Sequence, residues 1–186
     1  MSTDETHATD PASVIETLLP LATQTVTLAA TDRVGLVIVD PGVGFTRQGA
    51  LSDAERMVPM VHRIAQTHRD LQAALGERLP GLVFLDPHHA DIPEPPYPPH
   101  SIVGTGEELI DPDLAWLLDE PGVTVIRKDC INGFVGAIDR QSGRNAFCDW
   151  AIAQAPHKLL VTGDCTDICV SDFVVTTLSA RNHGLL

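Results

Sequence analysis

The stretch Gly163-Asp-Cys-Thr-Asp-Ile-Cys169-Val carries the strongest chemical signal in the sequence. Cys169 stands where an apolar helical pattern begins, so we expect it to open a helix. Backbone N–H groups and the positive dipole end stabilise a thiolate there, and the same donors can hold an oxyanion on a substrate carbonyl. The pattern favours a cysteine nucleophile, while the spacing of Cys165 and Cys169 also fits buried small side chains or a redox pair. Cys130 and Cys148 are expected to be structural.

A thiol nucleophile needs a base, and three charged residues follow apolar runs: Asp40, Asp86 and Lys128. The carboxyl ends of parallel strands meet at one sheet edge, which would bring the three together. Asp40 beside Lys128 would stay charged and oriented while it takes a thiol proton and later returns it to a leaving amine. A plain ion pair at the strand ends is the alternative.

Asp86-Pro-His88 and the later His100 supply one carboxylate and two imidazoles. This set suits Zn²⁺, Fe²⁺ or Mn²⁺, with positions left for water and substrate. Glu94 could serve as a fourth or water-mediated ligand, although a solvated loop acid is the expectation. Histidine also occurs by chance in such a loop, as His89 shows. Five further histidines are expected at surface or packing positions: His7, His62, His68, His157 and His183.

Aromatic residues make up only 4% of the chain, and two of them lie next to these groups. Phe45 follows Asp40 by five residues, and Tyr97 precedes His100 by three. Each could be ordinary packing. Two aromatics beside a metal and a thiolate would also form a slot for a flat ring, and an acidic protein does not favour an anionic ligand. A neutral heteroaromatic amide fits that slot.

Apolar runs alternating with helical patterns predict the scaffold for these residues. Strands are expected at 34–39, 81–85, 123–126 and 158–162. A helix starting at a capping box of Ser52 and Glu55 should run to Gly76, another should cover 145–154, and a short amphipathic piece is expected at 14–21. The alternation favours βαβ crossovers and a parallel sheet covered on both faces.

Length and charge limit the class of protein. The 186 residues, 44% of them apolar, suit one globular domain, and 25 acidic against 12 basic residues leave a net charge of −13, which disfavours nucleic acid as a partner. The apolar runs are far shorter than the roughly 20 residues of a membrane span. Four scattered cysteines and no secretory leader predict reduced thiols and a cytoplasmic location. Homo-oligomerisation is left open.

In their order along the chain, these motifs resemble the nicotinamidases of the isochorismatase-like cysteine hydrolases. The resemblance spans roughly residues 33–186 and is closest to plant-type members in the stretches HHADIPEPPYPPH, RKDCINGFVGAI, CTDICVSDFV and LSARNHG. It implies a three-layer α/β/α fold around a six-stranded parallel sheet. It also implies a metal-dependent amidohydrolase that converts nicotinamide to nicotinate and ammonia through a cysteine thioester.

The resemblance also assigns roles to individual residues. The matched positions are Cys169, Asp40 and Lys128 as the catalytic triad, Asp86, His88 and His100 as ligands of one divalent metal, and Phe45 and Tyr97 as the aromatics on either side of the substrate ring. The backbone N–H groups of Cys165 and Cys169 would form the oxyanion hole, shaped by a cis peptide before Cys165. Zinc is the first expectation for the metal, with Fe²⁺ or Mn²⁺ as alternatives.

Two features depart from the family pattern. Pro-Gly-Val-Gly follows Asp40 where many relatives carry Gln or Asn, and the chain stops at Leu186 where relatives continue with further strands. We therefore expect a hydrolase domain at 31–186 that is short of C-terminal strands, after a partly flexible extension at 1–30. The alternatives are another small-amide hydrolase of the superfamily, or an inactive truncated relative that only binds a partner.

Overall fold

The computed structural model describes residues 26–29, 31–76 and 79–186. The amphipathic piece expected at 14–21, and all but residues 26–29 of the expected extension at 1–30, lie outside the described residues. No helix in the described part of the chain is long and apolar enough to cross a membrane.

Four parallel strands form one sheet in the order β3-β2-β1-β4. They are β1 (Val34–Val39), β2 (Gly81–Leu85), β3 (Val123–Arg127) and β4 (Lys158–Gly163). The four strands expected from the sequence are confirmed, with β3 and β4 each one residue longer than predicted. β1 and β2 are buried along their whole length, as near-continuous apolar runs predict.

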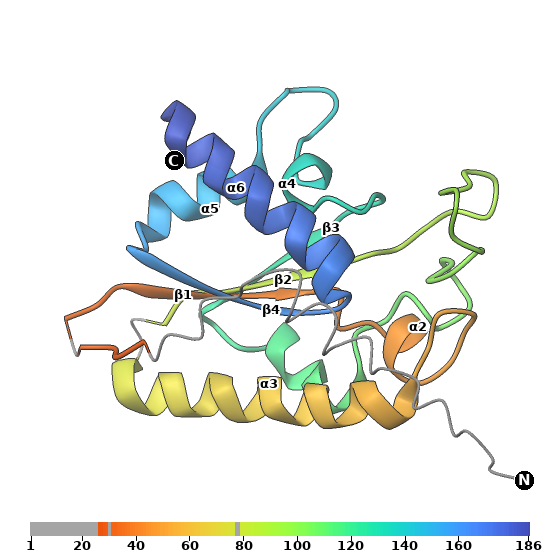
Figure 1. Cartoon of the computed structure of the whole chain (residues 1–186), viewed down its shortest axis with the longest axis horizontal. Helices are drawn as coiled ribbons and strands as arrows, with labels where there is room; N and C mark the ends of the chain where they lie inside the picture. The colour runs from red at the N-terminus through yellow and green to blue at the C-terminus, as the bar shows by residue number, and fades with distance from the viewer. Residues whose placement is uncertain (1–25, 30, 77–78) are drawn as a thin grey trace, which may run out of the picture.

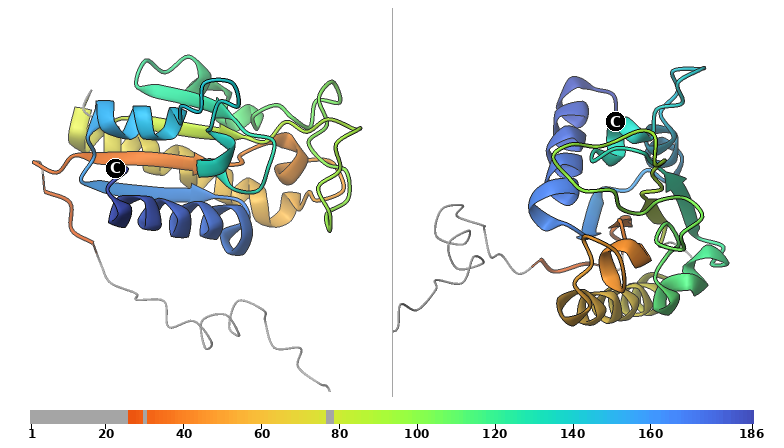
Figure 2. Two further views of the ribbon diagram at one scale, coloured as in Figure 1. Left: turned by 90° about the horizontal axis from the view of Figure 1, so that it is seen from above. Right: turned by 90° about the vertical axis from the view of Figure 1, so that its right-hand side faces the viewer.

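Helices cover both faces of the sheet, so the predicted three-layer α/β/α arrangement is confirmed (Figures 1 and 2). One face carries the long helix α3 (Ala54–Leu75) and the 3₁₀ helix η2 (Pro112–Leu118). The other carries α4 (Gly133–Gly136), α5 (Ala146–Gln154) and α6 (Ser171–His183). The short helix α2 (Val43–Thr46) follows β1 at the carboxyl edge of the sheet.

Alternation along the strands divides the core between the two faces. Leu36 and Ile38 pack with the buried residues of α3, whereas Val37 and Val39 pack with an aromatic group on the opposite face. The aromatics are Phe84, Phe134, Phe147, Trp150 and Phe173, and their ring pairs lie 4.9–6.4 Å apart. Each buried side chain of this size contributes about 1.5–3 kcal/mol, so both helical layers are firmly attached to the sheet.

The start of α3 differs from the predicted capping box. The N-cap is Asp53, whose carboxylate accepts a hydrogen bond from the Arg56 N–H, and the helix begins at Ala54. Ser52 instead donates its hydroxyl to the Gly49 carbonyl in the preceding turn, so it is not free to cap the helix. The predicted end is confirmed, because Gly76 terminates α3 with a φ of 64°.

β4 pairs with β1 along one side only, and no described strand lies against its other side. An apolar groove of about 570 Å³ runs beside this strand between α5 and α6. Its lining includes the apolar side chains of Leu159, Val174, Leu178 and Leu186 and the exposed side chains of Arg33 and Arg181. None of the residues predicted to do chemistry lines the groove, so the candidate site lies elsewhere.

Candidate active site and metal centre

Strand register brings the predicted charged residues to one edge of the sheet. Val39 lies beside both Phe84 and Gly163, and Leu85 lies beside Arg127, so the four strands end level with one another. The backbone ladder continues one residue further, where the Lys128 N–H donates to the Leu85 carbonyl at 2.8 Å. The residues immediately after the strands therefore share one cluster.

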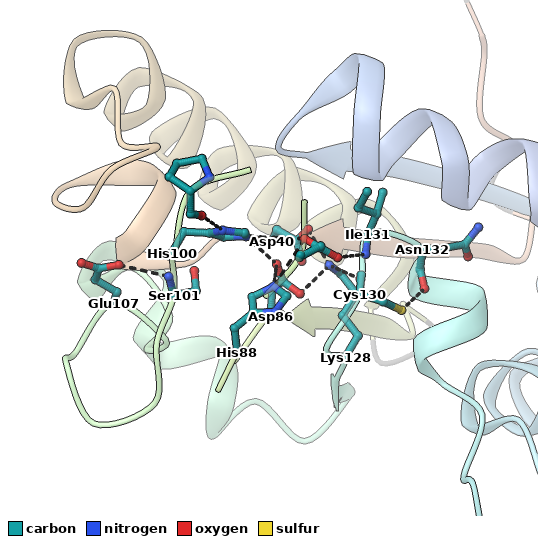
Figure 3. Close-up of polar contacts among 12 residues, drawn as sticks. Asp40, Asp86, His88, His100, Ser101, Glu107, Lys128, Cys130, Ile131 and Asn132 are labelled. Atoms are coloured by element: carbon teal, nitrogen blue, oxygen red, sulfur yellow. Dashed lines mark hydrogen bonds and ion pairs between the residues drawn. The ribbon is translucent and has the colours of Figure 1, made fainter. Parts of the chain in front are cut away.

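Lys128 is the centre of that cluster (Figure 3). Its Nζ lies 2.9 Å from Asp40 Oδ2 and 2.9 Å from Asp86 Oδ1, and it donates to the Cys130 carbonyl at 2.9 Å. All three charged side chains are buried. Burial alone would lower the pKa of Lys128, but the two carboxylates outweigh it and raise that pKa, so the ammonium stays charged.

Asp40 occupies an unusual position for an acid. Its backbone adopts a φ of 52°, which non-glycine residues rarely do, and its side chain is almost completely buried. Burial raises the pKa of Asp40 to about 7, with the Asp86 charge adding to the shift and Lys128 opposing it. A carboxyl group that titrates near neutral pH can both accept and return a proton in that range.

Cys169 lies beside this acid. Burial raises the pKa of its thiol, and interaction with the Asp40 carboxylate adds to the shift while Lys128 opposes it. The resting pair is therefore a protonated thiol next to a carboxyl group of much lower pKa. This arrangement lets Asp40 act as the base for Cys169 when a substrate carbonyl is present.

Cys169 does not open a regular helix, contrary to what we predicted from the sequence. Cys169 lies in a π-helical turn, η3 (Thr166–Val170), and the regular helix α6 begins two residues later at Ser171. The peptide bond between Asp164 and Cys165 is cis, as the family resemblance implies. The Cys165 carbonyl accepts from the Ile168 and Val170 N–H groups, so the wider turn carries the chain from the strand edge into α6.

Gly163 makes this close entry possible. Its φ is 129°, and a Cβ placed on it would lie 1.9 Å from the Val39 carbonyl oxygen of the neighbouring strand. Any other residue would push β4 away from β1 and move the cysteine segment that follows.

Three predicted metal ligands form a compact buried cluster. The donor atoms of Asp86, His88 and His100 all lie within 4.8 Å of one another. Asp86 Oδ2 is 2.9 Å from His88 Nε2 and 3.6 Å from His100 Nε2. Tetrahedral ligands at bond lengths of about 2.0–2.1 Å stand about 3.3 Å apart, so this spacing fits a zinc-sized cation.

The protonation of these groups also suits a metal. His100 Nδ1 lies 2.9 Å from the Pro98 carbonyl, an arrangement that fixes the proton on Nδ1 and leaves Nε2 to bind a cation. Burial would raise the pKa of Asp86, but its contacts with His100 and His88 and the charge of Lys128 hold it well below the ordinary value. Asp86 is therefore ionised, so one side of its carboxylate can bind a cation while the other pairs with Lys128.

Glu94 is not the solvated loop acid that we expected. Its side chain is 20% exposed, and one carboxylate oxygen accepts a hydrogen bond from the Ile131 N–H at 2.9 Å. The other oxygen lies 3.8 Å from Nε2 of both His88 and His100. Sequence spacing could not reveal the contact with Ile131, because it joins two loops that are 37 residues apart.

The two aromatics both lie close to the candidate metal ligand His100. The Phe45 ring centroid is 5.5 Å from that of His100, and the Tyr97 centroid is 6.4 Å from it. A small cavity of about 50 Å³ is lined by His88, Tyr97 and His100. Phe45 is buried, whereas Tyr97 is partly exposed.

A second polar group, which the sequence reasoning did not single out, holds the Phe45 segment in place. The fully buried Asp111 accepts hydrogen bonds from the Thr46 hydroxyl at 2.6 Å and from Arg47 Nε at 2.8 Å. Glu107 adds a contact from the same loop, since its carboxylate accepts from the Ser101 N–H at 3.0 Å. These loops tie α2 to the segment that carries His100.

Comparison with known proteins gives a relative in sequence and several in fold. The chain is 48% identical over 158 residues to Nicotinamidase 1 of Arabidopsis thaliana, a match that covers 82% of this chain and 63% of that protein. The chain therefore spans less than two thirds of the length of this relative. No family model matches the chain.

Among solved structures, the yeast nicotinamidase bound to the inhibitor nicotinaldehyde superposes with a TM-score of 0.61 at 13% identity, over 81% of this chain and 82% of that one. The pyrazinamidase of Pyrococcus horikoshii in complex with zinc gives a TM-score of 0.60 at 19% identity, over 82% and 80%. At these identities the structures establish the shared fold.

Proposed function

We propose that this chain, which belongs with the nicotinamidases among the isochorismatase-like hydrolases, hydrolyses nicotinamide to nicotinate and ammonia. One observation carries the proposal. Cys169 and the buried Asp40–Lys128 pair lie at the same sheet edge as the Asp86, His88 and His100 cluster, and Lys128 contacts both Asp40 and Asp86. This arrangement supports a cysteine nucleophile that works beside a bound metal. The 48% identity to a plant nicotinamidase supports the substrate.

In the acylation step, the Cys169 sulfur attacks the amide carbon and its proton passes to Asp40. The backbone N–H groups of Cys165 and Cys169 would hold the oxyanion that forms. As the tetrahedral intermediate collapses, Asp40 returns the proton to the departing ammonia and leaves a thioester on Cys169. Water then attacks the thioester, with Asp40 again taking the proton, and nicotinate leaves as the thiol is restored.

Lys128 determines how Asp40 behaves through this cycle. The ammonium at 2.9 Å favours the ionised carboxylate, while burial and the Asp86 charge favour the protonated form. The balance puts the pKa of Asp40 at about 7, where neither protonation state is strongly preferred. Asp40 can therefore both accept and release a proton near neutral pH.

Asp86, His88 and His100 would hold the divalent metal, which supplies a Lewis-acid site for the pyridine nitrogen of the substrate. Phe45 and Tyr97 would lie against the two faces of the ring. The donor set and its spacing support zinc, with Fe²⁺ or Mn²⁺ as the alternatives.

An ammonia-release assay with nicotinamide tests the reaction. Cys169→Ala should abolish turnover, whereas Cys148→Ala, which alters a cysteine on α5, should leave it within about twofold. His100→Ala should lower both bound metal and turnover, and His89→Ala, in the exposed neighbouring histidine, should lower neither. Undiminished ammonia release by the Cys169 variant would exclude the mechanism.

Metal analysis of the purified protein, followed by stripping and reloading with zinc, iron(II) or manganese(II), identifies the metal. Zinc should restore turnover. Hydrolysis of aliphatic amides in preference to nicotinamide, by protein without bound metal, would favour a different small-amide hydrolase of the superfamily.

The cellular compartment and the domain that carries this activity are also part of the proposal. All four cysteines are free, and Cys169 serves the proposed mechanism as a thiol, which supports a reducing compartment such as the cytoplasm. We assign the activity to one domain at 31–186. Limited proteolysis that leaves this segment intact would support that boundary.

A further inference from the structure

Glu94 connects two parts of the site that the reaction uses separately. One carboxylate oxygen holds the Ile131 N–H at 2.9 Å, and the other faces the imidazoles of His88 and His100 at 3.8 Å (Figure 3 shows Ile131 and both histidines). The side chain is 20% exposed, so water competes weakly for it. A carboxylate in this place serves two partners at once.

The Ile131 contact matters because of what the same turn does for Lys128. The Lys128 ammonium donates to the Cys130 carbonyl at 2.9 Å, and Cys130 directly precedes Ile131 in the chain. The turn continues into Asn132, whose side chain caps α4 and donates to Thr176 Oγ1 on α6 at 2.7 Å. A displacement of Ile131 would therefore reach Lys128 on one side and the nucleophile helix on the other.

We propose that Glu94 is a positioning residue that couples the metal centre to the turn at 129–132, and through it to Lys128. When the imidazoles hold a cation, the carboxylate oxygen facing them is drawn to its charge, and the other oxygen is fixed more firmly on the Ile131 N–H. Metal loading thus tightens the turn that places Lys128 against Asp40. The inference rests on the proposed function for its catalytic consequence, but not for the coupling itself.

Two variants separate the two contacts of the Glu94 carboxylate, one with the Ile131 N–H and one with the imidazoles. Glu94→Gln keeps an oxygen to accept from Ile131 and removes the negative charge, whereas Glu94→Ala removes both. Asp91→Asn, in an exposed acid of the same loop, is the matched control. The Gln variant also preserves side-chain volume, so it guards against misfolding as the explanation of any change.

Zinc affinity of the metal-stripped proteins, measured by competition with a chromophoric chelator, tests the contact between the carboxylate and the imidazoles. Both Glu94 variants should bind zinc about 10–100-fold more weakly, the range for an outer partner of metal ligands, and Asp91→Asn should bind as wild type does. Unchanged zinc affinity in Glu94→Gln would overturn the proposal.

Amide hydrogen exchange at Ile131 tests the hydrogen bond from the Ile131 N–H to Glu94 and its coupling to the metal. In metal-free protein, exchange should be at least about tenfold faster in Glu94→Ala than in wild type and should be restored in Glu94→Gln. Saturating zinc should slow this exchange at least about threefold in wild type and less than twofold in Glu94→Ala. An Ile131 amide that responds to neither the Ala substitution nor zinc would refute the coupling.

At saturating zinc, kcat for nicotinamide should fall about tenfold in Glu94→Ala and stay within about threefold in Glu94→Gln, with KM little changed. Equal kcat in the two variants would overturn the link to Lys128. If wild type releases no ammonia from nicotinamide, the proposed function fails, while zinc affinity and amide exchange still decide the coupling.

Discussion

Replacing Lys128 with Met is the sharpest perturbation of the site. The ammonium is completely buried and lies 2.9 Å from both Asp40 and Asp86, so it neutralises two buried carboxylates. Methionine has similar length and no charge. The variant therefore leaves the shape of the site nearly intact and removes the shared countercharge.

The geometry sets the size of the effect. Two unit charges 2.9 Å apart interact by about 6 kcal/mol at an effective dielectric constant of about 20. Loss of that interaction raises the pKa of Asp40 by up to about four units from its value of about 7, so the carboxyl group stays protonated beyond pH 9. With Asp40, the proposed base, protonated, the protein should lose about 10³-fold or more in kcat/KM for nicotinamide at pH 7.5. The free energy of unfolding should fall by about 3–5 kcal/mol, the cost of breaking a buried ion pair.

Steady-state ammonia release between pH 5 and 9, with urea unfolding of the same samples, measures both effects. Lys158→Met is the matched control, because Lys158 forms a partly exposed ion pair with Asp32 at 2.7 Å, away from the site, and such surface pairs contribute little to stability. The reasoning is refuted if Lys128→Met keeps kcat/KM within tenfold of wild type, with its midpoint still near pH 7.

Three further outcomes follow from the site. For wild type, kcat/KM should increase as pH rises through about 7, because in the proposed mechanism Asp40 must be ionised to accept the thiol proton. A profile that is flat from pH 5 to 8 would contradict this role. Gly163→Ala should unfold the protein or greatly reduce its yield, since the added Cβ would overlap the backbone of β1. The control Gly143→Ala has open space around the added Cβ and strains only a positive φ, so it should lower the free energy of unfolding by about 1 kcal/mol in thermal unfolding. Asp111→Asn should lower the free energy of unfolding by about 1–3 kcal/mol in urea, because it weakens the hydrogen bonds that the buried Asp111 carboxylate accepts from Thr46 and from the partly exposed Arg47. Burial alone would raise the pKa of Asp111, but the hydrogen bonds from Arg47 hold that pKa below its ordinary value. Acidification protonates Asp111 and should therefore lower the stability of wild type, whereas the Asn variant should lack this contribution to the pH dependence.

The sequence alone determined the scaffold and its chemically active edge. Continuous apolar runs ending in Asp40 and Asp86 identify strands buried on both faces, and parallel strands must present their next residues at a common edge. The type and order of Lys128, His88 and His100 then indicate an ion pair and a cation site. These inferences hold because strand period, crossover length and ligand chemistry are local properties of the chain.

Tertiary structure decided the features that depend on contacts between distant loops. Ser52 could not be excluded as the cap of α3 until the turn at Gly49 was seen to occupy its hydroxyl. The π-helical turn around Cys169 and the close approach of Gly163 to β1 are also features that no local sequence pattern encodes.

Glu94 shows the same limit most clearly. Its spacing from His100 suggests a possible metal ligand, and its polar loop suggests a solvated acid, but only the packing of that loop against the turn after β3 gives it Ile131 as a partner. Burial and charge at the sheet edge are likewise collective, because the pKa of Asp40 depends on Lys128 and Asp86 arriving from other strands. Residue types set which chemistry is available, and three-dimensional packing sets the protonation states and the connections that use it.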